Sequence, residues 1–266
     1  MTMLEAGDNR RVSLFFRGVR FVRRMLLRAL DLSIAVMPRR FIRKGSVNWF
    51  IATEIRYGGF VRYASRNRIS KQDHRYESVA SAPGHEGGDR MGRGRHAYGK
   101  TYAQISKLIP TAPVVAELGV LRGQGLAIWA DRFPQALIVG LDLDFAYFEA
   151  YRERLDKLGA FRSGSLALVH FDAFDPQTAE LERLLDGRRI DLFVDDGPHD
   201  QWAIVRTFQA VSPLLAPGAV YVIEDAVHSL SELQSIHSEF AWLQNGGLVL
   251  GRRQGPIGLP PVFGPA

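Results

Sequence analysis

The sequence predicts an α/β fold built on a doubly wound, mostly parallel sheet with a helical, basic N-terminal extension. Two observations in the C-terminal part of the 266-residue chain support this prediction. Short apolar runs rich in β-branched residues alternate five times with helical stretches, as expected when crossover helices connect parallel strands. The runs also lack polar alternation, which is expected when helices cover both faces of the sheet. The predicted strands are residues 114–120, 137–143, 166–172, 190–196 and 219–225, and the predicted helices are residues 124–132, 146–158, 176–186 and 201–215.

Composition excludes several classes of protein. Hydrophobic residues make up 46% of the chain, which is enough for a sizeable core and argues against general disorder. The chain has no cysteine, so disulfides, thiolate metal sites and a cysteine nucleophile are excluded. No apolar run approaches the roughly 20 residues of a membrane-spanning helix. We therefore expect a cytoplasmic protein, with peripheral contact to the inner membrane surface left open.

Charge divides the chain into two parts. Residues 1–110 hold 22 basic and 8 acidic residues, whereas residues 111–266 hold 12 basic and 20 acidic residues. We expect residues 1–65 to form a basic, helical N-terminal extension. Residues 66–95, which are rich in Gly, Ser, Arg and His, are expected to form a loop or linker, and residues 96–266 the main domain.

The basic segment 10–44 begins with an amphipathic helical pattern. On a wheel of about 100° per residue, one face carries Phe15, Val19, Val22, Leu26 and Leu30, and the opposite face carries Arg17, Arg20, Arg24 and Arg28. The sequence favours a helix that packs on the main domain with its arginines in water. The alternative is a helix that lies on an anionic membrane surface. A secretory signal is not expected, because Arg28 and Asp31 interrupt the apolar stretch.

Acidic residues lie at the end of every predicted strand. They are Glu117, Asp142, Asp144, Asp172, Asp195, Asp196, Glu224 and Asp225. Carboxylates at these positions are costly for packing, and ligands of doubly wound sheets bind beyond the carboxyl ends of the strands. The sequence therefore predicts a binding site at this edge of the sheet.

The loop after the first predicted strand runs from Glu117 to Gly125. Gly119, Gly123 and Gly125 allow tight turns and close approach of a ligand to the backbone, and the following helix offers free amide groups. A dinucleotide site would have the pattern G-x-G-x-x-G, whereas this loop carries an acid that would repel a pyrophosphate. The acid suits a ligand with a cationic end, such as an amino acid.

Two further acids complete a predicted cofactor pocket. Asp142 lies about 20 residues beyond the loop, where an acid typically accepts hydrogen bonds from ribose hydroxyls. Capping of the next helix by Asp142 or Asp144 is the structural alternative. Asp172 is placed to meet the amino group of adenine. The expected ligand is S-adenosylmethionine, and the chain resembles the Rossmann-like class I methyltransferase family over roughly residues 95–250.

The motifs Val-Asp-Asp-Gly-Pro-His at 194–199 and Ile-Glu-Asp at 223–225 predict a metal site. Carboxylates at adjacent strand ends form a hard oxygen site for Mg²⁺ or another divalent cation. Such an ion lowers the pKa of a bound hydroxyl. His199 lies three residues beyond Asp196, and its ordinary pKa suits a general base at neutral pH.

These motifs resemble those of the metal-dependent sugar O-methyltransferases of macrolide biosynthesis and the cephalosporin hydroxylase-like group. The resemblance implies that Asp196, Glu224 and Asp225 bind Mg²⁺ and that His199 is the base. The stretch 87–102 resembles the family segment that precedes the first strand, and we expect it to fold over the cofactor or substrate. Its H-x-Y-x-x-x-Y core consists of His96, Tyr98 and Tyr102, of which Tyr98 is expected at the cofactor.

The chain also departs from this family at two places. Pro198 replaces the usual Ser in the first motif, which bears on the loop that carries His199. After residue 225 the sequence shows one good strand, near residues 248–250. We therefore expect the family's closing hairpin to be abbreviated or to be built from the Pro-rich tail.

The resemblance implies an S-adenosylmethionine-dependent, divalent-metal-assisted O-methyltransferase that acts on a hydroxyl of a sugar or glycoconjugate. The sequence leaves two other functions open. A nucleic-acid methyltransferase would explain the basic N-terminus, but the position of its usual N/D-P-P-Y/F motif reads D-D-G-P-H, and strand-end acids repel phosphates. A non-catalytic membrane-surface protein would need neither the acids nor His199. A small-molecule or glycan partner is expected, nucleic acid is not, and a homo-oligomer is left open.

Overall fold

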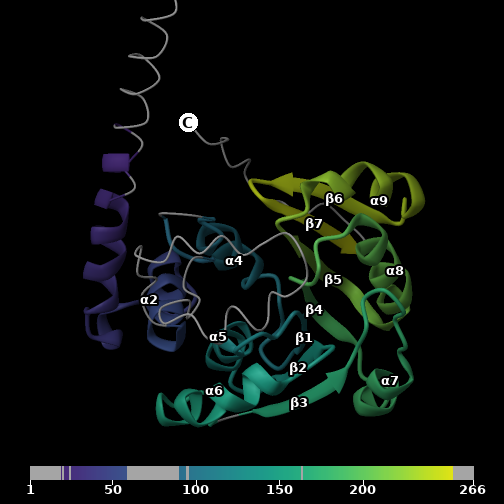
Figure 1. Ribbon diagram of the computed structural model, residues 1–266, viewed down its shortest axis with the longest axis horizontal. Coiled ribbons are helices and arrows are strands. Elements are labelled where there is room, and N and C mark those ends of the chain that lie inside the picture. The colour runs from purple at the N-terminus through teal and green to yellow at the C-terminus, as the bar shows by residue number, and fades with distance from the viewer. Residues whose placement is uncertain are drawn as a thin grey trace, which may run out of the picture.

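The computed structural model describes residues 19, 21–23, 25–58, 90–93, 96–162 and 164–253. A seven-stranded sheet lies at its centre, with the strand order β3-β2-β1-β4-β5-β7-β6 (Figure 1). The strands are β1 Val114–Leu118, β2 Leu137–Asp142, β3 Ser165–His170, β4 Ile190–Asp195, β5 Leu215–Glu224, β6 Phe240–Asn245 and β7 Leu248–Arg253. The helices are α2 Val47–Gly58, α4 Gly99–Ile105, α5 Gln124–Arg132, α6 Ala146–Lys157, α7 Ala179–Leu185, α8 Gln201–Val211 and α9 Leu230–Ile236, with short 3-10 helices η1 Arg39–Phe41, η2 Ser212–Leu214 and η3 Val227–Ser229.

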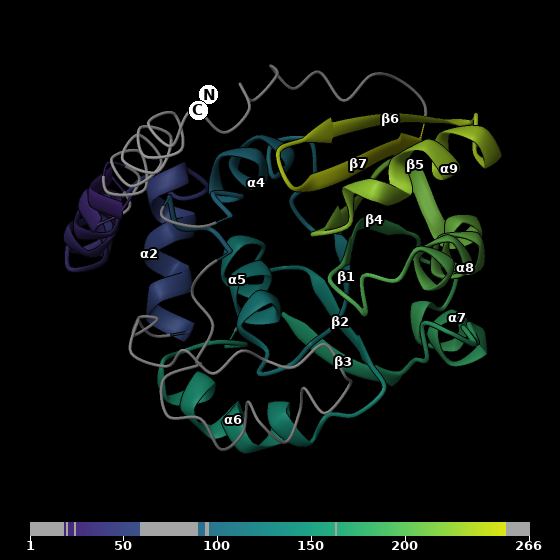
Figure 2. The same cartoon turned by 45° about the horizontal axis from the view of Figure 1, so that its top comes forward.

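Two hydrophobic cores lie on the two faces of the sheet. One core holds side chains of α2, α4, α5 and α6, and the other holds side chains of α7, α8 and α9 (Figure 2). Alternate residues of each central strand enter opposite cores, for example Val115 and Ala116 of β1. The predicted doubly wound α/β fold is thus confirmed, and burial on both faces explains why the strands are continuous apolar runs.

The topology places a ligand crevice at one position. β1 pairs in parallel with both β2 and β4, so the direction of winding reverses at β1. In doubly wound sheets, ligands bind outside the carboxyl ends of the strands at this reversal. β5 also pairs in parallel with β4, whereas β7 runs antiparallel to β5 and β6. The carboxyl ends of β1, β4 and β5 therefore lie side by side.

The end of the chain differs from the sequence-based expectation. β6 and β7 form a full antiparallel hairpin from Phe240 to Arg253. The expectation of an abbreviated hairpin or one built from the Pro-rich tail was therefore wrong. β6 was missed because it lies at the sheet edge, where its middle residues are exposed or half-buried, and its apolar run is only four residues long, from Phe240 to Leu243.

The predicted helices agree with the structure to within a few residues. The predicted helix 124–132 matches α5, and the predicted helix 146–158 matches α6 apart from its last residue. The helix predicted at 201–215 ends earlier, at Val211, and continues as the 3-10 helix η2, which contains Pro213. Proline has no N–H to donate within a helix, so the α-helix stops before it.

The N-terminal region contributes to the main core. Trp49, Phe50 and Ile51 of α2 are buried, and the ring of Phe50 packs against those of Tyr102 and Trp129. Residues 1–18 and 59–89, which include Phe15, Arg17 and most of the predicted linker, lie outside the described residues. In the described part, α2 and the strands therefore share one core.

The helix before α2 has the opposite orientation to the favoured expectation. Its described residues, 19, 21–23 and 25–35, are referred to below as the N-terminal helix. Asp31 and Ile34 are buried toward the body of the protein, whereas Val22, Leu26 and Leu30 are exposed. The expectation that the apolar face packs on the main domain was therefore wrong. None of the helices in the described ranges combines the length and hydropathy needed to cross a bilayer.

Candidate active site

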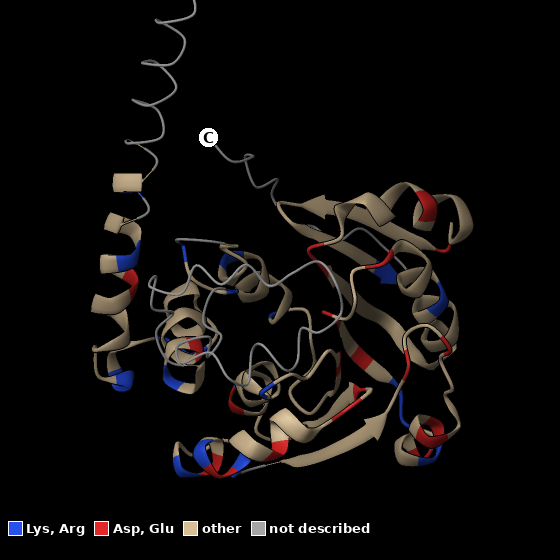
Figure 3. Cartoon of the chain, viewed as in Figure 1, with Lys and Arg blue, Asp and Glu red and all other residues tan. Residues whose placement is uncertain are grey.

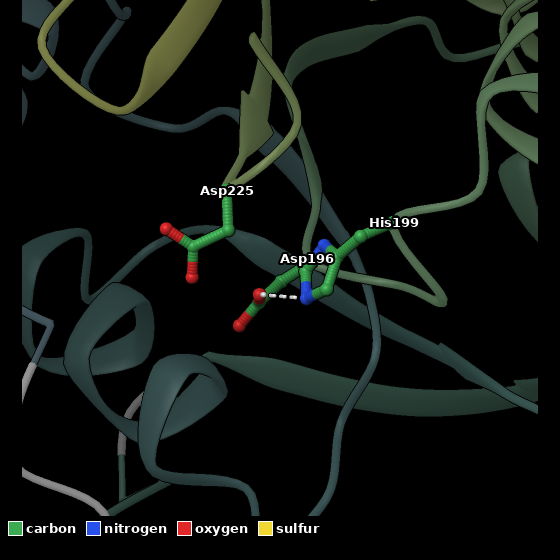
Figure 4. Close-up of side chains that lie close together, drawn as sticks. All are labelled: Asp196, His199 and Asp225. Atoms are coloured by element: carbon green, nitrogen blue, oxygen red, sulfur yellow. Dashed lines mark ion pairs between the residues drawn. The ribbon is translucent and has the colours of Figure 1, made fainter. Parts of the chain in front are cut away.

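Three side chains from neighbouring strand ends converge in the crevice. Asp196 and His199 follow β4, and Asp225 follows β5 (Figure 4). One ligand atom from each lies within 4.8 Å of the others, and His199 Nε2 is 3.8 Å from Asp196 Oδ1. All three side chains are partly exposed, with fractions of 29%, 32% and 38% for Asp196, His199 and Asp225. Two carboxylates and an imidazole are a donor set that fits a divalent cation.

Two of these residues have an unusual backbone. His199 and Asp225 both have φ of 55°, in the left-handed region that few residues other than glycine adopt. Such conformations cost on the order of 1–3 kcal/mol each and concentrate at functional sites. Here they occur at the two turns that bring the three ligand atoms together.

Asp225 is held in its ionised form. His96 Nδ1 lies 3.1 Å from Asp225 Oδ1, and the Tyr98 hydroxyl donates a hydrogen bond to the same oxygen. Partial burial acts to raise the pKa of the Asp225 carboxyl, but the hydrogen bonds from His96 and Tyr98 outweigh it and lower the pKa to about 2. The described part of the predicted segment 87–102 thus reaches the site through His96 and Tyr98. In the structure, Tyr98 contacts Asp225, and its role at the cofactor stays a prediction.

Glu224 and Asp225 are consecutive but have different surroundings. Arg90 Nε lies 2.7 Å from both carboxylate oxygens of Glu224, and the Tyr102 hydroxyl donates to Glu224 Oε1. Glu224 is buried, whereas Asp225 is partly exposed in the crevice. Glu224 is the last residue of β5, whereas Asp225 follows the strand with φ of 55°, so the regular strand geometry ends between them. The structure therefore places Glu224 in an internal ion pair, and its role as a metal ligand stays a prediction.

Asp195 and Asp196 are also consecutive and have different surroundings. The Tyr221 hydroxyl donates to Asp195 Oδ2 at 2.9 Å, and the backbone N–H of Gly197 donates to Asp195 Oδ1 at 3.3 Å. Burial raises the pKa of the Asp195 carboxyl to about 6, although these hydrogen bonds oppose the shift. Asp195 therefore supports the loop after β4, and Asp196 faces the crevice.

Glu117 already has a cationic neighbour in the structure. Its Oε1 accepts a hydrogen bond from Arg90 Nη1 at 2.9 Å, and its Oε2 accepts one from Trp129 Nε1 at 2.6 Å. Burial acts to lower the pKa of the Arg90 guanidinium, but Glu117 and Glu224 raise it, so Arg90 stays charged. Arg90 thus joins the carboxyl ends of β1 and β5. The predicted contact of Glu117 with the cofactor stays a prediction.

The three loop glycines are required by packing within the chain. Gly119 has φ of 89°, and a Cβ atom there would overlap with the backbone carbonyl of Asp196. Gly123 has φ of 79° and lies against an aromatic ring of α6, and a Cβ atom at Gly125 would overlap with Glu117. The loop after β1 therefore lies directly against the loop after β4, and the cofactor roles of the glycines stay predictions.

Asp142 and Asp172 each hold local backbone. Oδ2 of Asp142 accepts hydrogen bonds from the backbone N–H of Val120 at 2.8 Å and of Leu121 at 3.3 Å. Oδ1 of Asp172 accepts one from the N–H of Phe174 at 2.8 Å. Asp142 thus connects the end of β2 to the glycine loop. Both acids lie at the predicted strand ends, and their contacts with a nucleoside stay predictions.

Comparison with known proteins identifies the domain. Residues 116–226 match a protein family described as a methyltransferase domain. This part of the chain is similar to methyltransferases. It is also 31% identical over 141 residues to 8-demethyl-8-alpha-L-rhamnosyl tetracenomycin-C 2'-O-methyltransferase of Streptomyces olivaceus, an alignment that covers 50% of this chain and 34% of that protein. The chain therefore spans about a third of the length of this relative. The resemblance to methyltransferases is confirmed.

Two solved structures are similar to the chain. MycE, a methyltransferase of the mycinamycin biosynthetic pathway in complex with Mg and SAH, aligns with a TM-score of 0.47 and 17% identity over 79% of this chain and 73% of MycE. The O-methyltransferase TomG from Streptomyces achromogenes, involved in tomaymycin synthesis and in complex with SAM, aligns with a TM-score of 0.43 and 16% identity over 58% of this chain and 77% of TomG.

Sequence reasoning missed two polar residues beside this methyltransferase site. Arg90 lies in the predicted linker 66–95 and also in the stretch 87–102 that was expected to fold over the cofactor or substrate, but no local pattern distinguishes it from Arg93. Asn245 ends β6, a strand that was not predicted. Both residues reach the site through contacts that are distant in sequence, so a single sequence carries no signal for them.

A cavity of about 360 Å³ shares two of its lining residues with the surroundings of Asp225. Its lining includes His96 and Tyr98, the two residues that hold Asp225, together with Thr101 and Asn245. The Asn245 side chain is buried, with 4% of the residue exposed, and neither of its amide atoms has a hydrogen-bond partner in the described part of the chain. An unpaired buried amide is costly, so this position is suited to a polar ligand.

Proposed function

We propose that the chain is an S-adenosylmethionine-dependent, divalent-metal-assisted O-methyltransferase that acts on a hydroxyl of a sugar or glycoconjugate. The observation that carries the proposal is the convergence of Asp196, His199 and Asp225 within 4.8 Å, at strand ends beside the glycine loop of a methyltransferase domain. The named activity of the Streptomyces olivaceus relative, a 2'-O-methyltransferase of a rhamnosyl compound, supports a sugar hydroxyl as the acceptor.

The residues at the end of β1 fit the amino-acid part of S-adenosylmethionine. Arg90 Nη2 is buried and has no hydrogen-bond partner within the described residues, and it belongs to the guanidinium that pairs with Glu117. An acid and a base side by side match a zwitterion that carries an ammonium and a carboxylate. When bound, S-adenosylmethionine supplies an electrophilic methyl group on its sulfonium. The proposed role of the Glu117–Arg90 pair is to orient that group toward the acidic cluster.

The acidic cluster fits a divalent cation, and its residues have separate proposed tasks. Asp196 and Asp225 would hold the ion, which would lower the pKa of a hydroxyl placed there. Asp225 is kept ionised by His96 and Tyr98, so its carboxylate is a ready ligand at neutral pH. His199 accepts the hydroxyl proton on its imidazole. The acceptor oxygen then forms its bond to the methyl carbon while the carbon–sulfur bond breaks, in an in-line displacement that depends on alignment.

The cavity beside the cluster supports a hydroxyl-rich acceptor. The amide of Asn245 offers one acceptor oxygen and two donor hydrogens, which is the complement of neighbouring sugar hydroxyls. Binding would satisfy an amide that the described residues leave without partners. In this proposal the cavity holds the sugar ring, and the Asp225 end of the cavity receives the reacting hydroxyl.

The experiment that tests this function is transfer of a radiolabelled methyl group from S-adenosylmethionine into a lysate of the native host. Products are separated into nucleic acid, protein, lipid and glycan, with and without a chelator. We expect label in glycan or glycolipid, and we expect the chelator to abolish it. Label in nucleic acid, or transfer that is indifferent to the chelator, contradicts the proposal.

The variant His199→Ala tests the assignment of the base. We expect turnover to fall about 10²–10⁴-fold, the usual contribution of a general base. Binding of S-adenosylmethionine, measured by calorimetry, is expected to be unchanged, because His199 has no proposed contact with it. Unchanged turnover in this variant would remove His199 from the mechanism.

A further inference from the structure

Exposed apolar side chains are concentrated near the N-terminus. Among the described residues, 17 large hydrophobic side chains are exposed, and ten of them lie between residues 19 and 41. These ten, which we call the N-terminal apolar surface, are Val19, Phe21, Val22, Met25, Leu26, Leu30, Leu32, Val36, Met37 and Phe41. The other seven are scattered over the remaining elements. Scattered apolar residues are ordinary, whereas a contiguous patch indicates an interaction site.

The helix presents this surface away from the protein. At about 100° per residue, the seven members between Val19 and Leu32 occupy roughly half of the helix circumference. Asp31 and Ile34 lie on the other half and are buried against the body. Figure 2 shows the helix at the edge of the molecule, beside α2. The helix is therefore attached by one side and presents a broad apolar side outward.

The charges around this surface have one sign. The described residues between 19 and 44 include six Lys and Arg residues, of which Arg39 pairs with Asp131, and a single acid, Asp31. Asp31 is buried and accepts hydrogen bonds from the Arg93 backbone N–H at 2.8 Å and from Arg93 Nη1 at 2.7 Å. Basic residues are coloured blue on the helix and on the segment that follows it (Figure 3). On the wheel, Arg23 and Arg28 fall at the two edges of the apolar half. The one negative charge of the segment is thus turned inward and neutralised.

We propose that the N-terminal apolar surface docks on an anionic lipid bilayer, with the helix lying in the plane of the interface. An apolar half flanked by arginines is the arrangement of interfacial helices, since long basic side chains reach the headgroups while the apolar residues enter the acyl boundary. Phosphates of anionic lipids complement the basic residues of this described region, among them Arg23, Arg28 and Arg40. A second copy of the chain is a poorer occupant, because it would bring two positive segments together. This proposal does not depend on the proposed function.

The test is co-sedimentation of the full chain with vesicles at low salt. Vesicles that mix phosphatidylcholine with phosphatidylglycerol are compared with vesicles of phosphatidylcholine alone. We expect the protein to pellet with the mixed vesicles, and binding to weaken as salt is added. The variant Leu26→Glu should lower partitioning about tenfold or more, since it removes a large apolar side chain and adds a negative charge. The matched control is Ile236→Glu, which makes the same kind of change at an exposed apolar residue of α9. This variant should bind the vesicles like the wild type.

Circular dichroism melting of both variants establishes that they fold, which is expected because both side chains are exposed. Failure of the wild type to pellet with mixed vesicles overturns the proposal, and so does equal pelleting of Leu26→Glu and the wild type. Sedimentation velocity without vesicles tests whether a second copy of the chain covers the surface, by measuring whether the protein is a dimer. A dimer that Leu26→Glu dissociates, together with no vesicle binding, would assign the surface to a second copy of the chain.

Discussion

Arg90 is the residue on which the interior of the site depends most. Its guanidinium lies between Glu117 and Glu224, two buried carboxylates from the ends of β1 and β5. Loss of one partner from a buried ion pair is strongly destabilising, because the remaining charge keeps its desolvation cost without its partner. Here a single substitution would leave two carboxylates uncompensated.

The variant Arg90→Met is therefore expected to lower the free energy of unfolding by about 3–5 kcal/mol. The measurement is equilibrium unfolding in urea. Arg183→Met, on the exposed side of α7, is a matched control that should stay within about 0.5 kcal/mol of the wild type. Equal effects of the two substitutions would show that the Arg90 pairs contribute nothing to stability.

Asn245 allows ligand binding to be separated from folding. Its amide has no hydrogen-bond partner within the described residues, so Asn245→Leu removes polar atoms that the fold does not use. We expect stability to be equal or higher, by up to about 1–3 kcal/mol, because an unsatisfied buried polar group is lost. In the same variant the KM for the acceptor should rise while binding of S-adenosylmethionine stays the same. A loss of stability would instead assign Asn245 a structural role.

Among the elements, the loop after β1 is constrained by its neighbour after β4. Gly119→Ala places a Cβ atom against the backbone carbonyl of Asp196, and backbone cannot move aside as a side chain can. Gly187 has a similar φ of 78° but open space around it, so Gly187→Ala is the control. Both alanines adopt a left-handed conformation, which costs about 1–2 kcal/mol. Gly119→Ala should cost about 1–3 kcal/mol more in thermal or urea unfolding, through overpacking. Equal costs would mean that the two loops separate easily.

The strand ends explain why the motifs only partly specify the site. Two acids in succession occur at the ends of β4 and β5, Asp195–Asp196 and Glu224–Asp225, and the two members of each pair have different surroundings. One member of each pair enters the crevice and the other becomes part of the interior. The sequence shows both acids, but which of them faces the crevice depends on the packing around each strand.

At the scale of the whole molecule, the N-terminal region is connected to the site. Glu54 of α2 is buried, and its two carboxylate oxygens accept hydrogen bonds from the backbone N–H groups of Arg90 and Met91, each at 2.9 Å. Arg90 in turn pairs with the acids of β1 and β5. α2 therefore positions the segment that completes the interior of the site, across more than thirty residues of chain.

The variant Glu54→Gln tests this connection. An amide can accept only one of the two hydrogen bonds well, because its NH₂ group faces another donor. We expect a loss of about 1–3 kcal/mol in the free energy of unfolding, together with weaker binding of S-adenosylmethionine. Glu153→Gln, on the exposed side of α6, should change neither quantity. An unaltered Glu54→Gln protein would mean that the segment is positioned by other contacts.

The sequence by itself determined the sheet, its five parallel strands and the edge at which the acids gather. Buried parallel strands must be apolar throughout, so each leaves a recognisable run, and their carboxyl ends necessarily share one edge. For the same reason, two short motifs already contained Asp196, His199 and Asp225, although they did not separate these residues from Asp195 and Glu224.

The tertiary structure alone decided how the other parts are used. The partners of Arg90 are 27 and 134 residues away in sequence, and β6 is an edge strand whose apolar run is only four residues long. The orientation of the N-terminal helix is a third feature that only the tertiary structure decided. Periodicity identifies its apolar half but not the side that faces the protein, because the choice depends on contacts such as Asp31 with Arg93. A local sequence pattern indicates whether a segment is buried. Contacts between residues that are distant in sequence decide which neighbour it is buried against.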